Sequence, residues 1–167
     1  RNVAVGRLAL STDTLGSKST AIGYQALTTQ NFSSATDSRN TAVGYNAGLS
    51  ITTATSNVLV GSLCGVALTV GNANVAIGDS ALTTATQGDR NVAIGYLALE
   101  NQNFTSSTDS YNTAVGYNAG GAITTGSNNT IIGGLAGDAM TTGSANTAIG
   151  ISAMGGAITT GTSNTAV

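Results

Sequence analysis

The stretch Asn40-Thr41-Ala42-Val43-Gly44-Tyr45-Asn46-Ala47-Gly48 decides the fold of this chain, because its first five residues return along the whole sequence. Most returns have the form Asn-(Thr/Val)-Ala-(Val/Ile)-Gly, and their glycines are 17 or 21 residues apart. Repeats this short indicate a solenoid, in which each unit contacts only its neighbours. The glycines of the phrase are Gly6, Gly23, Gly44, Gly61, Gly78, Gly95, Gly116, Gly133 and Gly150.

Within one unit, the residues from Thr41 to Val43 are β-prone, and side chains along a strand alternate between two faces. Ala42 is therefore expected to point to one face, and Thr41 and Val43 to the other. Gly44 suits a sharp bend or a positive φ angle. We expect a second short strand at Tyr45–Ala47 and a polar return loop of turn-forming residues. The sequence thus predicts an all-β, parallel β-solenoid (β-roll) of about ten short rungs.

Stacked rungs place like residues in columns, and two of these columns bear on oligomeric state. The mostly alanine column suits a cramped interior, whereas the Val/Ile column on the opposite face would remain in water on a thin coil. Packing that column against copies of itself predicts a homotrimer. The alternative is a wider monomeric solenoid whose interior takes both faces. The predicted oligomer seam consists of Val5, Ile22, Val43, Val60, Ile77, Ile94, Val115, Ile132 and Ile149.

A third column is made of asparagine and is broken only at Ser19. Stacked asparagine side chains can hydrogen-bond to one another along a β-stack. The expected ladder is Asn2, Asn40, Asn57, Asn74, Asn91, Asn112, Asn129, Asn146 and Asn164.

The chain is expected to be a single repeat domain, 1–167, with a longer internal period. Residues 19–90 and 91–162 form two blocks of four rungs each, with partial rungs at both ends. Because the last phrase stops at Val167, we expect the sequence to be a segment of a longer fibre.

The longer interval of each block adds four residues, and insertions in solenoids form loops that often bind partners. The two loops, Thr28–Ser38 and Glu100–Ser110, contain an aromatic ring beside amides and a carboxylate, which suits a host-surface glycan or protein. The alternative is that each phenylalanine folds back as a plug over the neighbouring tyrosines, Tyr24/Tyr45 and Tyr96/Tyr117. The candidate contact residues are Asn31, Phe32, Asp37, Asn103, Phe104 and Asp109.

Composition argues against several function classes. Only 7% of residues are charged, the net charge is −2, and histidine is absent. We therefore expect no enzyme, no cofactor or metal site, and no nucleic-acid partner, since phosphate binding needs clustered Lys and Arg. The longest apolar stretch, Val58–Val70, is too interrupted to insert into a membrane. Cys64 occupies an alanine position of its rung and is expected to be a small buried residue.

The repeated phrase, as in Asn40–Gly48, resembles the head repeats of trimeric autotransporter adhesins (YadA-like) and is even more similar to repeats of phage tail fibres. The similarity covers the whole chain. It implies a trimeric β-roll in an extracellular fibre, at a cell surface or on a virion, whose surface attaches to a host. The rungs of 17 and 21 residues are longer than the usual repeat of the adhesin family.

The sequence therefore predicts a structural and adhesive segment of an extracellular fibre, a spacer that presents attachment loops. One alternative is a filament subunit that stacks head to tail. A second is an ice-binding β-solenoid with flat threonine rows. Adjacent threonine pairs prompt this last alternative, and they are Thr28-Thr29, Thr52-Thr53, Thr83-Thr84, Thr124-Thr125, Thr141-Thr142 and Thr159-Thr160.

Overall fold

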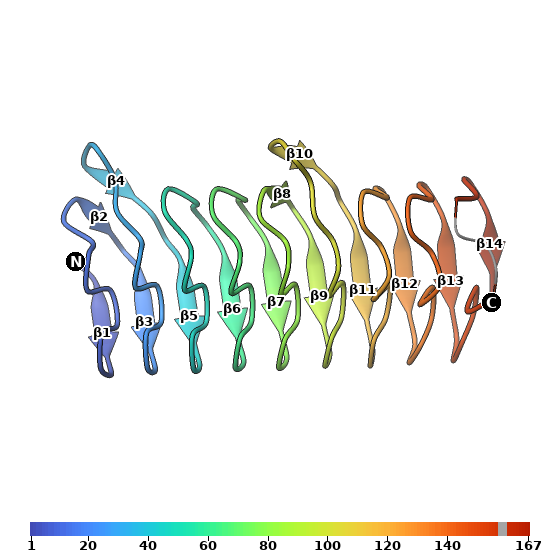
Figure 1. Ribbon diagram of the computed structural model, residues 1–167, viewed down its shortest axis with the longest axis horizontal. Helices are drawn as coiled ribbons and strands as arrows, with labels where there is room; N and C mark the ends of the chain where they lie inside the picture. Colours follow the sequence, from blue (N-terminus) through green and yellow to red (C-terminus); the bar gives the residue numbers. More distant parts are fainter. Residues whose placement is uncertain (157–159) are drawn as a thin grey trace.

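The computed structural model describes residues 1–156 and 160–167 and shows a parallel β-solenoid. About nine turns of chain stack along one axis, and the described residues contain no helix. Figure 1 shows the rungs side by side, with the two termini at opposite ends of the stack. The predicted all-β solenoid class is confirmed.

One ten-stranded parallel sheet runs the length of the solenoid, and its strands follow one another in chain order. Ala42, for example, lies opposite Ala21 on one side and Leu59 on the other. The strands are β1 (Val3–Val5), β3 (Thr20–Ile22), β5 (Thr41–Val43), β6 (Val58–Val60), β7 (Val75–Ile77), β9 (Val92–Ile94), β11 (Thr113–Val115), β12 (Thr130–Ile132), β13 (Thr147–Ile149) and β14 (Thr165–Ala166).

Two shorter parallel pairs lie at the edge of the solenoid opposite the arrowheads of the long sheet (Figure 1). β2 (Gly16–Ser17) pairs with β4 (Thr36–Asp37), and β8 (Gly88–Asp89) pairs with β10 (Thr108–Asp109). β4 and β10 belong to the two 21-residue rungs, so the extra residues of each block build these pairs.

The strand pleat separates the interior from the surface as predicted. Ala42 and its column equivalents from Ala21 to Ala148 are fully buried, whereas Val43 is half-buried and Ile77 is 38% exposed. The wider monomeric solenoid, with both faces inside, is therefore not the structure of this chain. The Val/Ile column lies on the outer face of the long sheet.

Wherever a further glycine corner follows in the stack, the stacking itself requires glycine at the end of the strand. Gly61 has a φ of 142°, and a Cβ atom built on it would lie 2.3 Å from the carbonyl oxygen of Gly78 in the next rung. The neighbouring rung leaves no room for any side chain at this corner, because a carbonyl oxygen of the backbone cannot move aside.

The second strand predicted at Tyr45–Ala47 is wrong, because this segment forms a turn. Asn46 and Gly48 have φ angles of 54° and 59°, which no β-strand accommodates. The backbone still bonds between rungs here: Asn46 N donates to Tyr24 O at 2.9 Å, and Gly48 N donates to Cys64 O at 3.0 Å. A tight corner is thus stabilised as a strand would be, without strand geometry.

Glycines inside this corner compensate for the large residues of the alanine column. A Cβ atom on Gly65 would lie 2.9 Å from Cδ2 of Leu59, and one on Gly48 would lie 2.8 Å from Cδ1 of Leu59. Ile131, the other large residue of the column, has the same relation to Gly120 and Gly137. Each bulky side chain therefore fills the space that neighbouring glycines vacate.

The buried asparagine ladder bonds each rung to the next. The side chain of Asn57 donates to Asn40 Oδ1 at 3.2 Å and to Gly71 O at 3.0 Å, and it accepts from Asn74 N at 2.9 Å. Burying an amide requires such partners, so the ladder satisfies four or five polar groups per rung within the interior.

Gln30 repairs the ladder where Ser19 interrupts it. Its Oε1 accepts from Asn40 Nδ2 at 2.8 Å, and its Nε2 donates to Asp13 Oδ2 at 2.8 Å. In the second block Gln102 Nε2 donates to Asn91 Oδ1 at 3.0 Å. The longer rungs thus bring a glutamine inside, a contribution that the sequence columns did not reveal.

Candidate functional site

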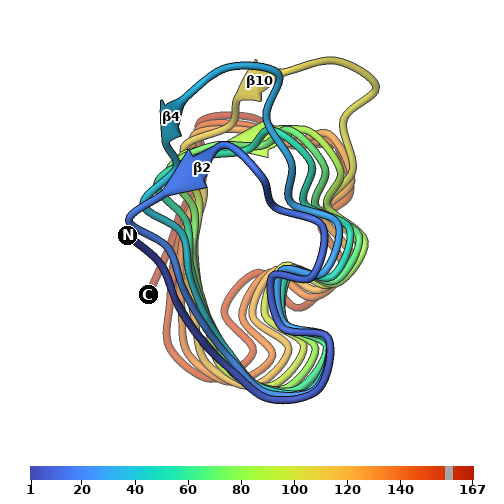
Figure 2. The ribbon, with the colours of Figure 1, turned by 90° about the vertical axis from the view of Figure 1, so that its left-hand side faces the viewer.

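Both inserted loops project beyond the outline of the other rungs at the same edge of the solenoid (Figure 2). β4 and β10 mark their positions, and they are separated along the axis of the stack (Figure 1). The loops therefore form two copies of one surface feature.

The asparagines of the loops bond to the preceding rung. Asn31 Oδ1 accepts from Thr14 Oγ1 at 2.9 Å, and Asn103 Oδ1 accepts from Thr86 Oγ1 at 2.7 Å. Their backbone N–H groups donate to carbonyl oxygens of the following rung, Thr52 O and Thr124 O, both at 2.9 Å. Both side chains are exposed, but their carbonyl oxygens already anchor the loop.

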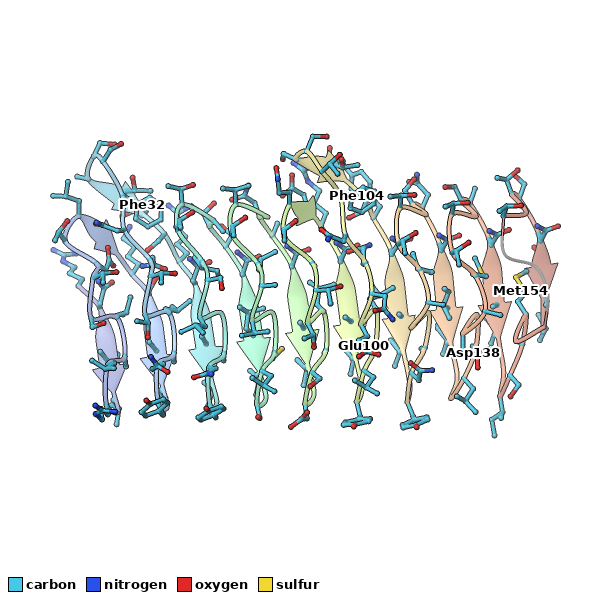
Figure 3. All side chains as sticks on the ribbon, viewed as in Figure 1. Phe32, Glu100, Phe104, Asp138 and Met154 are labelled. Atoms are coloured by element: carbon cyan, nitrogen blue, oxygen red, sulfur yellow. The ribbon has the colours of Figure 1, made fainter. Side chains whose placement is uncertain are left out.

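Phe32 and Phe104 are both 7% exposed, so the loops bury their aromatic rings. Figure 3 shows both rings at the loop edge of the solenoid. The tyrosines lie at the opposite edge, two residues beyond the ends of their strands, and stack on each other. The predicted packing of Phe32 and Phe104 over tyrosine is therefore wrong. Phe104 instead packs close to Gly88, where the absent side chain makes room.

The loop carboxylates form exposed ion pairs. Asp37 Oδ2 accepts from Lys18 Nζ at 2.6 Å and from Arg39 Nη2 at 3.1 Å, and Asp109 pairs with Arg90. The hydrogen bond from Lys18, followed by one from Ser17, lowers the pKa of Asp37 to about 2. A carboxylate so paired is stabilised in its charged form. The six candidate residues thus mainly hold the loops in place.

The exposed tips of the loops carry small side chains, most of them with a hydroxyl group. They consist of Ser33, Ser34 and Ala35 in the first loop and Thr105, Ser106 and Ser107 in the second. No predicted contact residue lies at either tip. Any attachment role of the loops would fall to these hydroxyl groups and to the neighbouring backbone.

The predicted seam residues lie in one column on the outer face of the long sheet, and the strand register places them opposite one another. Ile22, Ile77 and Ile149 are 38–39% exposed in the single chain. The threonines and valines that begin each strand share this face. The face is therefore a continuous apolar and threonine-rich surface.

In several of the adjacent threonine pairs, one hydroxyl group is bonded to the backbone of the next rung. Thr29 Oγ1 donates to Leu49 O at 2.6 Å, Thr52 Oγ1 to Thr69 O at 3.2 Å, and Thr84 Oγ1 to Glu100 O at 2.7 Å. These hydroxyls link successive rungs. Thr159, in the last pair, lies outside the described residues.

An exposed column of side chains that sequence reasoning did not single out follows the glycine corner. Backbone bonds between successive rungs fix its order; for example, Asn46 N donates to Tyr24 O and Leu63 N to Tyr45 O. Its tyrosines stack in pairs, with ring centroids 5.5 Å apart in one pair and 5.8 Å in the other. The column, which we call the tyrosine column, contains Arg7, Tyr24, Tyr45, Ser62, Asp79, Tyr96, Tyr117, Gly134 and Ile151. The sequence does indicate this column, because its residues are the ones that directly follow the key glycines of the repeat.

The single cysteine of the chain lies in the interior. Cys64 is fully buried, and burial raises the pKa of its thiol to about 12, so it is a packing residue as predicted. Residues 1–156 and 160–167 contain no cluster of three or more potential metal ligands and enclose no pocket. No helix among them has the length and apolar character needed to cross a membrane.

Comparison with known proteins gives no family for this chain: no family model, no curated protein sequence and no solved structure matches it.

Proposed function

We propose that this chain is a shaft segment of an extracellular fibre, a rigid spacer whose copies pack through the outer face of the long sheet into a homotrimer. The half-exposed Val/Ile column on that face carries the proposal. The interior of each copy is already filled by alanine and leucine, so only another molecule can cover the outer column. The resemblance to adhesin-head and tail-fibre repeats supports the trimeric arrangement and the extracellular location.

The size of the column supports the same proposal. Ten strands at ~4.8 Å give a stripe roughly 45 Å long and, with the side chains about 10 Å wide, on the order of 450 Å². Apolar patches of roughly 300–600 Å² are the largest that monomers expose, and they are often functional. Three such faces meeting around one axis would remove them all from water.

Light scattering after size-exclusion chromatography tests the assembly. The expected mass is three times the 16.3 kDa of the single chain. Ile77→Asp should dissociate the assembly, because it would bring an unpaired carboxylate into an apolar seam. Ser106→Asp, which adds the same charge at an exposed loop tip, is the matched control. A monomeric unmodified chain would refute the trimer, and a mass that grows without limit would favour the head-to-tail filament.

We further propose that the loop tips provide the attachment surface of the fibre, for a host glycan or protein. The observation that supports this proposal is that both loops project from the solenoid at the same edge (Figure 2). Replacing Ser33 and Ser34 together with Ser106 by glutamate should abolish attachment to host cells while leaving the assembly intact. The control carries the same number of glutamates at exposed positions of the glycine corner, which lies at the edge opposite the loops. Unchanged attachment would leave the loops as structural elements only.

A specific observation favours ice binding as a second candidate, through threonines other than the adjacent pairs. Thr20, Thr41, Thr113, Thr130 and Thr147 begin strands of the long sheet and lie on its outer face beside the Val/Ile column. A monomer that shows thermal hysteresis, and loses it with Thr41→Lys, would favour this candidate. A trimer would exclude it, because the same face would then be covered.

A further inference from the structure

We propose that the tyrosine column is a contact surface for a second copy of this chain, which runs antiparallel and fills the spaces between the tyrosine pairs. The proposal concerns a different edge of the solenoid from the sheet face, so it does not rest on the proposed trimer. Its basis is the match between the spacing of the rings and the spacing of the spaces.

The column alternates two occupied levels with two levels that lack a ring. Tyr24 and Tyr45 stack 5.5 Å apart, and Tyr96 and Tyr117 stack 5.8 Å apart. Between the two pairs lie only Ser62 and Asp79. Three rung steps at ~4.8 Å separate the facing rings by roughly 14 Å, which is the room that two further stacked rings need.

A second copy supplies rings at that spacing because it carries the same column. In the antiparallel alignment that places Asp79 level with Tyr96 of the other copy, Ser62 lies level with Tyr117. Because a two-fold axis relates the two copies, the rings of each copy fill the corresponding space of the other copy. The two tyrosine pairs and the space between them are therefore self-complementary.

The outer tyrosine pair meets small or apolar residues in the same alignment. Tyr45 lies level with Gly134, around which a Cβ atom would have nothing within 4 Å. Tyr24 lies level with Ile151, whose side chain is 85% exposed in the single chain. All eight rings of the two copies then form one continuous stack.

Polar groups of the column also find partners in this alignment. The hydroxyls of Tyr45, Tyr96 and Tyr117 make no hydrogen bond to other residues of the described part of the chain, and their side chains are 49–56% exposed. Asp79 is exposed and, within the described part of its own copy, its Oδ1 accepts from Ser80 Oγ at 2.9 Å. The Tyr96 hydroxyl of the second copy can donate to the free carboxylate oxygen.

The geometry of the rings argues for a second copy over a glycan. Stacked rings present their edges to solvent, and the faces that remain open look along the fibre axis into the spaces. A sugar would stack on a ring face that is open to the side of the fibre, which these rings do not present. An inserted ring of matching spacing can cover both open faces of a space.

The expected contact is weak for a single pair of rods. Eight paired levels at ~4.8 Å and a width of about 10 Å give on the order of 800 Å² for both partners together, within the range of transient interfaces. The contact would therefore be detected at high protein concentration, and it would bundle fibres in which many columns repeat.

Sedimentation equilibrium over a wide concentration range measures this association for the unmodified chain and for variants that lose or gain aromatic rings. Tyr45→Ala with Tyr96→Ala should weaken it about tenfold or more, since two stacked rings are lost from each copy. Ser62→Tyr with Asp79→Tyr should also weaken it, although this variant adds aromatic surface, because the spaces are then filled. If the association came from nonspecific apolar contact, the variant with filled spaces would associate more strongly than the unmodified chain. Ser34→Ala with Ser106→Ala, two truncations that lie outside both the tyrosine column and the sheet face, is the matched control and should leave the association unchanged.

Cross-linking checks the antiparallel register. In a Cys64→Ala background, Asp79→Cys should be joined to its own copy by a short bismaleimide, because the two sites lie one rung step apart along the axis. Ser62→Cys should not be joined, because its two copies lie three steps apart. Absence of association in the unmodified chain, stronger association of the filled variant, or equal cross-linking at both sites would each overturn the proposal.

Discussion

Replacing Asn57 by alanine should destabilise the solenoid severely, because it removes one link from the middle of the buried ladder. Most neighbours keep one partner: Asn40 Oδ1 still accepts from the residue-57 N–H at 2.9 Å, and Asn74 Nδ2 still donates to Gly88 O at 2.9 Å. Two groups lose the one hydrogen-bond partner that they have in the described part of the chain, the backbone N–H of Asn74 and the carbonyl oxygen of Gly71.

The magnitude follows from these two groups. A buried polar group left unsatisfied costs about 1–3 kcal/mol, so the expected loss in free energy of unfolding is about 2–6 kcal/mol. Asn2→Ala is the matched control, because Asn2 belongs to the same ladder but is exposed at its end. Water replaces its partners there, and the expected loss is below about 1 kcal/mol.

Urea unfolding followed by far-ultraviolet circular dichroism measures both losses, provided that the transitions are single and share one slope. Equal effects of Asn57→Ala and Asn2→Ala would refute the reasoning, since burial would then not determine the cost. A loss below about 1 kcal/mol for Asn57→Ala would show that neighbouring groups rearrange to satisfy one another.

The remaining predictions concern the corner, the thiol and the loop ion pair. Gly61→Ala should cost more than about 3 kcal/mol in the same assay, through its φ of 142° and the clash with the next rung, whereas Gly134→Ala should be nearly neutral. Cys64 should resist thiol reagents at pH 8 until the protein is unfolded, because its pKa is raised to about 12; rapid labelling of the folded chain would contradict its burial. The pKa of Asp37 is lowered to about 2 from 3.8, so its stabilising pairing should be complete above about pH 4 and lost as the pH falls through 2. Side-chain NMR titration measures this, and Lys18→Ala should raise the midpoint.

Much of the fold could be predicted from the sequence because the rungs are nearly identical. The phrase around Gly44 gave the strand, its two faces and the stacking order, since a strand alternates faces whatever surrounds it. The alanine position of Cys64 likewise predicted its burial. Asn57 and its equivalents were predicted to form a ladder, and that ladder is present.

Sequence reasoning failed where conformation depends on the adjacent rung. Tyr45–Ala47 was predicted to form a second strand, but the close approach of the next rung and the positive φ angle of Asn46 make this segment a corner. Phe32 was expected to pack against tyrosine, yet the corner sends tyrosine to the opposite edge of the solenoid.

By itself, therefore, the sequence determined the period, the strands and the columns, because these depend on local propensity and repetition. The tertiary structure alone decided what fills each column: Leu59 takes the space left by Gly48 and Gly65, and Gln30 completes the ladder at Ser19. It also decided that the tyrosines stack in exposed pairs with two-level spaces between them. Volumes and hydrogen-bond partners depend on distances between rungs, and those distances exist only after the chain has stacked.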